Sequence, residues 1–371
     1  MQFLFMNENL ILAETFIVAF IITYISIPPL INVIHEKKLY AVPNGRTSHE
    51  KVTPTLGGLA IFSGFMISSM VFVKISQIPY IQYILAATII IFFIGLKDDI
   101  NGLSPLKKFL GEIIAAGIII DLGDIRITHL YGFAGMTTLN IATSDFLSLF
   151  IIVAIINAVN LIDGIDGLAS GVGILSSVAF GTWFYLIGEY QLAIMAVAIT
   201  GALLAFFRYN FFNSKKYKIF MGDIGSLMLG FILSIFAIKF NELNIMLDHA
   251  SPYFIKAAPS VSIGILILPV FDTVRVMLIR MAKGQSPFHA DKRHVHHYLL
   301  ELTGNHKKAT LILLITNLGF IILSFVLKNL SVLYLAEILT FMAIILSFIP
   351  YYMVRQRRKN NIIGKYKADT E

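Results

Sequence analysis

The sequence predicts an all-α, polytopic integral membrane protein with about eleven transmembrane helices. Two composition figures support this class: 57% of the 371 residues are hydrophobic and only 14% are charged, whereas soluble proteins carry about 25% charged residues. The mean hydropathy is +0.79. Apolar runs also recur at about 17–25 residues, the length that a helix needs to cross a bilayer.

The spans follow one another with short connections, and no polar segment is long enough to fold alone. We therefore expect residues 1–371 to form a single transmembrane domain, in which residues 355–371 are a basic tail. The first 25 residues have neither a basic start nor a small-residue cleavage site, so they are assigned to the first span. The predicted spans are 10–33, 56–73, 80–96, 106–120, 146–162, 169–187, 191–208, 223–240, 257–282, 309–327 and 331–354.

The distribution of basic residues predicts the orientation. With eleven spans the termini lie on opposite sides, and a cytosolic tail RQRRKNNIIGKYK places 23 of the 29 lysines and arginines in cytosolic segments. The N-terminus is then outside and the C-terminus cytosolic. The net charge of +7 is concentrated on that face, which favours lipid headgroups and phosphates as partners and requires no nucleic acid.

Two of these spans are unusual. The span 106–120 is only about 22 Å long, too short to cross a 30 Å core unaided, and it places Lys108 and Glu112 on one face. The span 257–282 contains Pro269, which predicts a kink. Its Asp272 and Arg275 lie three residues apart, and a structural ion pair and a catalytic role are equally compatible with that spacing.

Chemistry-bearing residues gather in the cytosolic loops. In the stretch NAVNLIDGIDGLASG, Asn157, Asn160, Asp163 and Asp166 follow at intervals of three, which places a polar seam along a helix that ends in an acidic loop. Helix capping by ordinary turn residues is the alternative for a single aspartate, but a run of four polar groups at a membrane boundary favours function. Further carboxylates in these loops are Asp98, Asp99 and Asp223.

So many carboxylates on one membrane face repel one another unless a cation lies among them. The chain has no cysteine, and oxygen ligands favour a hard ion such as Mg²⁺, with Mn²⁺ as a substitute. Enzymes that transfer phosphoryl groups combine magnesium with lysine and arginine side chains. Gly222 and Gly225 flank Asp223 at a predicted helix start, where phosphate can approach backbone N–H groups.

The sequence HVHH holds His294, His296 and His297 beside Lys292 and Arg293. A metal site is disfavoured because the spacing does not place the three rings on one helical face. An ordinary solvated loop is a second interpretation. We favour a third, in which the histidines and neighbouring basic groups form a clamp for phosphate.

Taken together, these motifs resemble the polyprenyl-phosphate N-acetylhexosamine-1-phosphate transferases. The similarity extends from about Val42 to Gly304, in the order VPNGRTSHEKVTPTLGG, GLKDDINGLSPLKKFLGE, NAVNLIDGIDGLASG, NSKKYKIFMGDIGSL, LPVFDTVRVMLIR and SPFHADKRHVHH. The resemblance implies a phosphotransferase of the bacterial cytoplasmic membrane, acting on its cytosolic face. It would move a sugar 1-phosphate from a UDP-sugar to undecaprenyl phosphate and release UMP.

The resemblance also implies roles for individual residues. It assigns catalysis to three carboxylates (Asp98, Asp99 and Asp163) and the magnesium ion to Asp223. The uridine end would contact Asp166, Asn213 and Phe220. The phosphates and the sugar would be bound by Lys51, Lys108, Asn160, His294, His296 and His297. A homodimer is a further expectation.

The spaced His-x-His-His form resembles the branch that takes UDP-GlcNAc or a related N-acetylaminosugar, in the first membrane step of cell-surface polysaccharide synthesis such as O-antigen, capsule or teichoic acid. A phospho-N-acetylmuramoyl-pentapeptide transferase is the alternative within the family. A secondary transporter is the rival from another class, but transporters place coupling acids near the midplane. Three positions depart from the family pattern: Glu112 stands for a usual Gln, SKKYK for a His-Pro-Ala-type stretch, and Thr47 for a frequent Lys.

Overall fold

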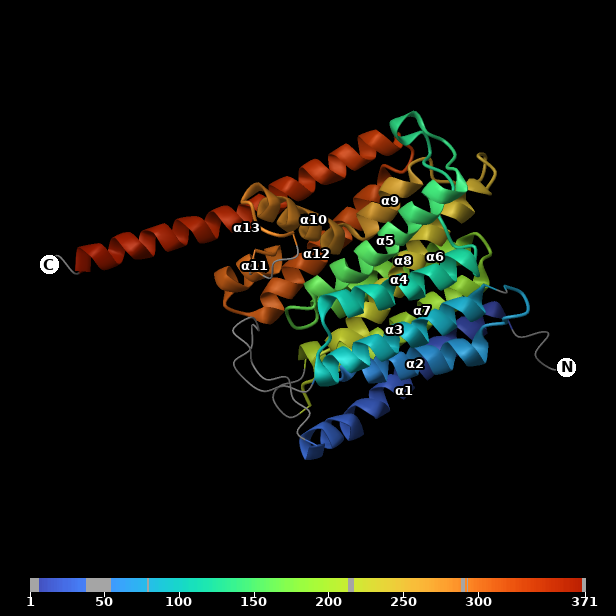
Figure 1. Cartoon of the computed structure of the whole chain (residues 1–371), viewed down its shortest axis with the longest axis horizontal. Helices are drawn as coiled ribbons and strands as arrows, with labels where there is room; N and C mark the ends of the chain where they lie inside the picture. The colour runs from blue at the N-terminus through green and yellow to red at the C-terminus, as the bar shows by residue number, and fades with distance from the viewer. Residues whose placement is uncertain are drawn as a thin grey trace.

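The computed structural model describes residues 7–37, 55–78, 80–212, 217–287, 291 and 293–368. The described chain is a bundle of helices that run mostly parallel to one long direction (Figure 1). The helices are α1 (Glu8–Lys37), α2 (Gly57–Phe72), α3 (Ile81–Asn101), α4 (Pro105–Asp121), α5 (Ile141–Ile162), α6 (Leu168–Leu186), α7 (Tyr190–Phe207), α8 (Gly222–Ile245), α9 (Ala258–Ile265), α10 (Ile267–Ala282), α11 (Val295–Thr303), α12 (His306–Val326) and α13 (Val332–Ala368).

The all-α membrane architecture is confirmed, since each predicted span falls on a helix or on the pair α9–α10. Eight helices in the described ranges are long and apolar enough to cross a membrane, and the bent pair raises this to nine. The other two predicted spans correspond to α2, with 16 residues, and α4, with 17. The count of eleven and the side on which each terminus lies therefore stay predictions.

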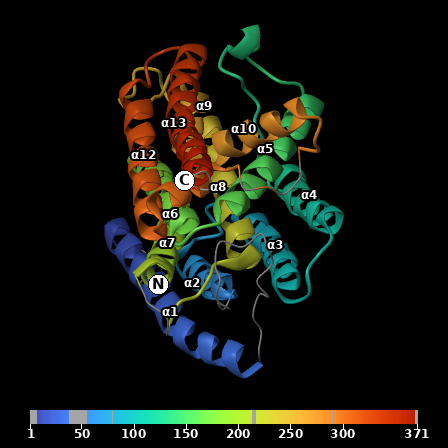
Figure 2. The same ribbon diagram turned by 90° about the vertical axis from the view of Figure 1, so that its left-hand side faces the viewer.

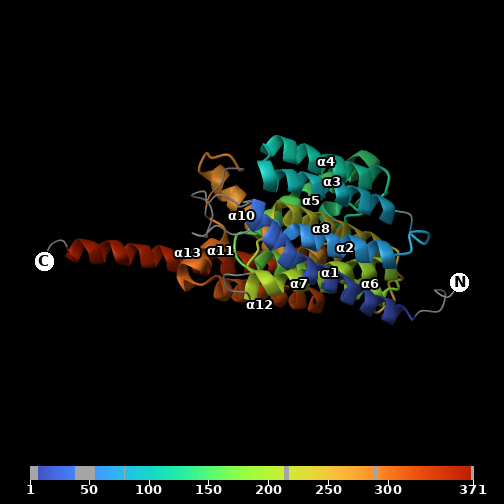
Figure 3. The same cartoon turned by 90° about the horizontal axis from the view of Figure 1, so that it is seen from below.

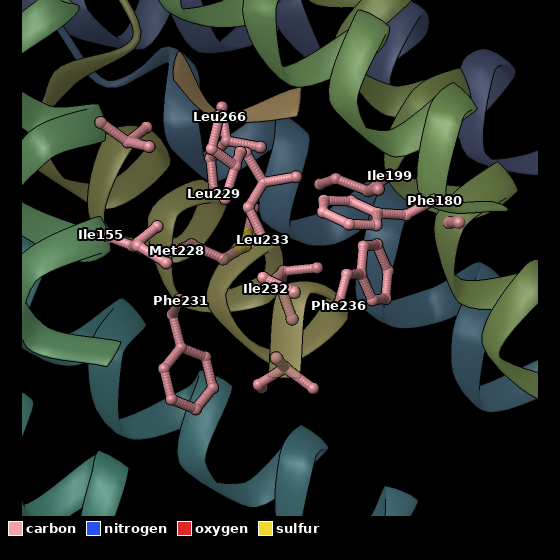
Figure 4. Close-up of a cluster of buried hydrophobic side chains, with 14 of the residues drawn as sticks. Ile155, Phe180, Ile199, Met228, Leu229, Phe231, Ile232, Leu233, Phe236 and Leu266 are labelled. Atoms are coloured by element: carbon pink, nitrogen blue, oxygen red, sulfur yellow. The ribbon is translucent and has the colours of Figure 1, made fainter. Parts of the chain in front are cut away.

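Helix α8 occupies the centre of the bundle, with α2, α3, α5 and α6 packed around it (Figure 2). Its most apolar window is 89% buried, the highest value among the candidate spans. Figure 4 shows the ring of Phe236 on α8 beside that of Phe180 on α6, and their centres are 6.4 Å apart. A helix that is apolar all round belongs in the core, and the residue at its N-terminus, Asp223, is thereby placed rigidly.

Glycines allow three helices to meet at the start of α8. A Cβ atom on Gly58 of α2 would overlap the backbone nitrogen of Gly225, and one on Gly95 of α3 would lie 2.5 Å from the Cα atom of Ile224. Small residues at such crossings let helix backbones approach closely in a membrane. The ends of α2 and α3 are consequently drawn toward Asp223.

The predicted kink near Pro269 is confirmed as a break, with α9 and α10 bent by 85° on either side of Leu266. Proline has no N–H, so the carbonyl oxygen of Ile265, four residues earlier, loses its helical partner. The hydroxyl of Ser176 on α6 donates to that oxygen at 3.3 Å. The break turns α10 across the end of the bundle that carries the acidic loops (Figure 2).

Two features lie beyond the bundle at this end. The region after α10 was predicted as one loop, but it contains α11, whose nine residues are too few to register as a hydropathy span. The predicted basic tail continues α13 as a helix to Ala368 and projects past the other helices (Figures 1 and 3). The start of α1 and the end of α13 lie at opposite ends of the bundle, as an odd number of crossings requires.

Candidate active site

The acidic loops meet where α3 and α5 end and α4 and α8 begin. At their centre the ammonium group of Lys108 donates to Asp98 Oδ2 at 3.0 Å and to Asp223 Oδ1 at 2.6 Å. All three side chains are largely shielded from solvent. The structure therefore brings Asp98, Lys108 and Asp223 together, and charge-assisted hydrogen bonds of this length are strong.

Asp99 has a different position from its neighbour Asp98. Its two carboxylate oxygens accept the backbone N–H groups of Asp223 and Ile224, at 2.9 and 3.1 Å, so it caps the N-terminus of α8. Gly222, with φ of +72°, precedes this cap. A Cβ atom there would collide with Asp99 and with the carbonyl oxygen of Thr55, which explains why glycine stands before Asp223.

The polar seam of α5 is confirmed, and its two asparagines reach different helices. Asn157 donates to Glu112 Oε2 on α4 at 2.6 Å, while Asn160 Oδ1 accepts the hydroxyl of Ser226 on α8 at 2.7 Å. Glu112 is only 1% exposed. Asn160 lies one turn before Asp163 on α5, and its partner Ser226 lies one turn after Asp223 on α8. This hydrogen bond therefore holds the two aspartates close to each other.

Asp163 ends α5 and is partly buried. Its desolvation, together with the negative charges of Asp223, Asp99 and Asp166, raises the pKa of Asp163 well above the ordinary aspartate value. Burial makes the larger contribution to this rise, and electrostatic repulsion by the neighbouring carboxylates adds to it. Proximity of a positive charge would relieve that repulsion.

Asp166 belongs to a second set of contacts beside the first. Its carboxylate pairs with Lys218 at 2.6 Å, and its carbonyl oxygen accepts the hydroxyl of Thr310 on α12. The ammonium group of Lys218 also lies 5.5 Å from the ring centre of Phe220. Asp166 and Phe220, predicted at the uridine end, are therefore linked through Lys218, which the sequence analysis did not select.

Asn210 is a second residue that the sequence analysis missed. It lies in a π-helical turn, Arg208–Phe212, that ends α7. Its side-chain oxygen accepts the N–H of Gly167 at 2.5 Å, and its side-chain nitrogen donates to the carbonyl oxygen of Ile219 at 2.8 Å. The signal available in the sequence was an asparagine among aromatic residues at the end of an apolar run. The neighbouring candidate Asn213 and the predicted phosphate ligand Lys51 lie outside the described residues.

The histidines approach from the α10–α11 side. His294 Nδ1 lies 2.9 Å from Asp272 Oδ2, and the same carboxylate accepts the N–H of Val295 and two bonds from Arg275. Asp272 thus fixes the ring of His294, which is 3% exposed. The Nε2 atom of His294 is buried and has no hydrogen-bond partner within the described chain.

His296 is also buried and lies on the acidic loop, because a Cβ atom on Gly164 would be 2.6 Å from its Nε2 atom. Burial, reinforced by the neighbouring His297, lowers the pKa of His296 to about 3, so its ring is neutral at pH 7. The ring centres of His296 and His297 are 4.2 Å apart. The three histidines therefore form one group against the loop of Asp163 and Asp166.

A buried arginine anchors the segment that precedes the histidines. Arg280 donates to both carboxylate oxygens of Asp291, at 3.0 and 3.1 Å, and to the carbonyl oxygen of Pro287. Burial alone would raise the pKa of Asp291, but the bonds from Arg280 and from the Arg293 N–H outweigh it and hold this pKa below its ordinary value. Lys292, predicted as part of the clamp, lies outside the described residues.

No three histidine, aspartate or glutamate side chains of the described ranges lie close enough to hold a metal ion by themselves. Magnesium usually takes one or two protein carboxylates and completes its shell with water and substrate phosphates. Asp223, whose side chain is 29% exposed, lies beside Asp98 and near Asp163 and provides such a partial set. The carboxylate donors therefore fit a magnesium ion that shares its ligands with a phosphorylated substrate.

Carboxylates, a bridging lysine and histidines at one end of a bundle of apolar helices fit a membrane-embedded transferase. The family model of glycosyl transferase family 4 matches residues 81–241. The chain belongs to this family. It is 32% identical over 327 residues to the decaprenyl-phosphate N-acetylglucosaminephosphotransferase of Mycobacterium tuberculosis, covering 81% of this chain and 79% of that protein. It is 30% identical over 260 residues to the undecaprenyl-phosphate alpha-N-acetylglucosaminyl 1-phosphate transferase of Escherichia coli, covering 70% and 68%.

Proposed function

We propose that this protein transfers N-acetylglucosamine 1-phosphate, or a related N-acetylaminosugar 1-phosphate, from a UDP-sugar to undecaprenyl phosphate and releases UMP. The observation that carries the proposal is the bridge of Lys108 between Asp98 and Asp223, beside Asp163. Such a site offers carboxylates to a metal ion and a cation to phosphate oxygens. The relatives named above support the choice of acceptor and sugar.

The proposed cofactor is Mg²⁺, which Mn²⁺ can replace. Asp223 would hold the ion, with Asp98 or Asp163 as a second carboxylate, and the diphosphate of the nucleotide sugar would complete the shell. Once bound, the ion supplies charge neutralisation for the diphosphate.

The chain's own residues then have separate tasks. An oxygen of the acceptor phosphate attacks the β-phosphorus of the UDP-sugar, and the bond from that phosphorus to the oxygen bridging the two phosphates breaks. Because a monoester phosphate is largely dianionic at pH 7, the attack requires no proton transfer to Asp98 or Asp163. Lys108 donates to phosphate oxygens, and Asp98 orients its ammonium group.

The nucleotide sugar would lie between the two sides of the site. The uridine end is proposed to contact the segment of Asp166, Lys218 and Phe220, which Asn210 ties to the α5–α6 loop. On the other side, His294 Nε2 is the buried ring atom left available to a bound sugar phosphate, since Nδ1 is bonded to Asp272.

We further propose that the site faces the cytosol from a bacterial cytoplasmic membrane. The charge bias of the loops supports that orientation. The acceptor's phosphate would then lie at the interface while its polyprenyl chain stays in the hydrocarbon. The reaction would be the first membrane step in the synthesis of a cell-surface polysaccharide.

The test is a product analysis with purified protein, undecaprenyl phosphate, Mg²⁺ and UDP-GlcNAc. We expect UMP in amounts equal to a new lipid whose mass corresponds to undecaprenyl diphosphate carrying GlcNAc, and we expect EDTA to abolish both. UDP-MurNAc-pentapeptide as the only accepted donor would instead support the alternative within the family. Uptake of substrate into proteoliposomes without any UMP would contradict the proposal and favour a transporter.

A further inference from the structure

The short helix α11 is held at both ends by other helices. At its N-terminal end, Asp272 of α10 accepts the N–H of Val295 at 3.2 Å and pairs with His294. At its C-terminal end, it contacts the part of α13 that projects beyond the bundle (Figures 1 and 3). A nine-residue helix is not stable alone in water, so its position depends on these anchors together with its packing against α12.

Two consecutive arginines of α13 make the C-terminal anchor. Arg358 donates from Nε and Nη2 to the two carboxylate oxygens of Glu301, at 2.9 and 2.6 Å. Arg357 Nη1 donates to the carbonyl oxygen of Glu301 at 3.3 Å and to that of Leu302 at 3.5 Å. The last carbonyl groups of a helix lack internal partners and form the negative end of its dipole, so a cation is well placed there.

Aromatic packing extends the contact toward the membrane. The rings of Tyr298 on α11 and Tyr351 on α13 meet edge to face, with their centres 5.6 Å apart. The fork of Arg358 and this ring pair fix both the height and the rotation of α11 against α13. Such geometry matters because Arg–carboxylate forks are directional as well as attractive.

The contact between Glu301 and the arginines of α13 lies close enough to the histidines to affect their position. Glu301 follows His296 by five positions, which is about 7.5 Å along the helix. His296 lies directly on Gly164, next to Asp163. A shift at the Glu301 end therefore moves the histidine ring relative to the acidic loop.

We infer that Glu301, Arg357 and Arg358 are positioning residues, through which the extension of α13 holds the histidine helix against the loop of Asp163. This inference rests on the proposed function and adds to it a segment that no recognised motif contains. The donor nucleotide sugar, which the histidines would contact, is the substrate whose use should depend on the anchor.

Charge exchange tests the inference. We expect Arg358→Glu and Glu301→Arg each to lower kcat/KM for UDP-GlcNAc three- to tenfold, with the KM for undecaprenyl phosphate unchanged. The double variant, which restores an opposite-charge pair, should return to within twofold of wild type. Arg355→Glu is the matched control, because it makes the same charge change on the same helix at an exposed residue that has no ion pair in the described chain.

Stability measurements separate positioning from folding. Arg358 is 64% exposed, and exposed ion pairs contribute little to stability, so all variants should melt within about 2 °C of wild type. If Arg358→Glu melts lower, Arg358→Gln provides the comparison without charge reversal. Kinetics of Arg358→Glu equal to those of Arg355→Glu, or a double variant no better than the single ones, would overturn the inference. A wild-type protein that releases no UMP would instead overturn the proposed function.

Discussion

Lys108 Nζ lies 2.6 Å from Asp223 Oδ1, although 115 positions separate the two residues in the chain. The same ammonium group reaches Asp98, so one lysine connects the end of α3, the start of α4 and the start of α8. In the proposed reaction it exchanges these carboxylates, in part, for phosphate oxygens. The first prediction follows from this double pairing.

Lys108→Met should lower kcat/KM about 100-fold, equivalent to about 2.7 kcal/mol of transition-state stabilisation. The substitution removes the donor to phosphate and leaves Asp98 and Asp223 without the charge between them. UMP release at saturating Mg²⁺ is the measurement. Lys107→Met is the matched control, because Lys107 is exposed on the same turn, and its activity should stay within twofold of wild type. A Lys108→Met variant within threefold of wild type would remove this lysine from the mechanism.

Asp99→Asn should lower thermal stability. The carboxylate accepts two backbone N–H groups of α8, and an amide can accept only with its one oxygen, so about 1–3 kcal/mol should be lost. The apparent melting temperature in detergent is the measurement. Asp98→Asn should impair turnover, because Asn keeps the oxygen that accepts the Leu103 N–H but loses the carboxylate oxygen that binds Lys108. Unchanged melting of Asp99→Asn, with activity lost, would favour the catalytic role that the sequence suggested.

Asn210→Leu should loosen the α5–α6 loop from the segment that precedes Asp223. The Asn210 side chain is 6% exposed, and the substitution removes both of its hydrogen bonds. The Gly167 N–H and the Ile219 carbonyl then lose this hydrogen-bond partner. We expect kcat/KM for the nucleotide sugar to fall at least tenfold. Thr200→Val is the control on the same helix, because the Thr200 hydroxyl bonds only within α7. Equal kinetics for the two variants would contradict the positioning role of Asn210.

The buried ring of His296 predicts a dependence of stability on pH. Its pKa is lowered to about 3 in the folded protein from 6.5 in the unfolded chain, so the unfolded state binds the proton first as pH falls. His296 should therefore destabilise the protein by about 1.4 kcal/mol per pH unit below 6.5. The difference in melting temperature between wild type and His296→Gln, measured from pH 7.5 to 5, should become less favourable to wild type with acidification. A difference independent of pH would mean that His296 has the same pKa in the folded and unfolded states.

Much of the fold follows from the sequence because a bilayer permits few alternatives. Backbone groups in hydrocarbon must be paired within helices, so apolar length alone locates the spans. The Asn157–Asn160 seam could be predicted because neighbours three apart share a helical face. The proline kink could be predicted for an equally local reason, namely the missing N–H of Pro269.

The details of the site depend on contacts between distant segments, which local patterns do not contain. Nothing in the pair Asp98–Asp99 distinguishes the carboxylate that meets Lys108 from the one that caps α8, because that depends on how α3 crosses α8 at Gly95. Asn210 was not predicted, because its partners Gly167 and Ile219 come from other segments of the chain. Helix α11 was missed because nine residues carry too weak a pattern to register beside long apolar spans.

The central claim is that carboxylates from separate helices hold one divalent cation beside the diphosphate of the donor. Its most direct test is the affinity for Mn²⁺, measured by electron paramagnetic resonance of the purified protein with UDP-GlcNAc present, for wild type and for Asp223→Asn. We expect saturable binding of one ion to wild type and at least tenfold weaker binding to the variant. Equal Mn²⁺ affinity of the two proteins would contradict the claim.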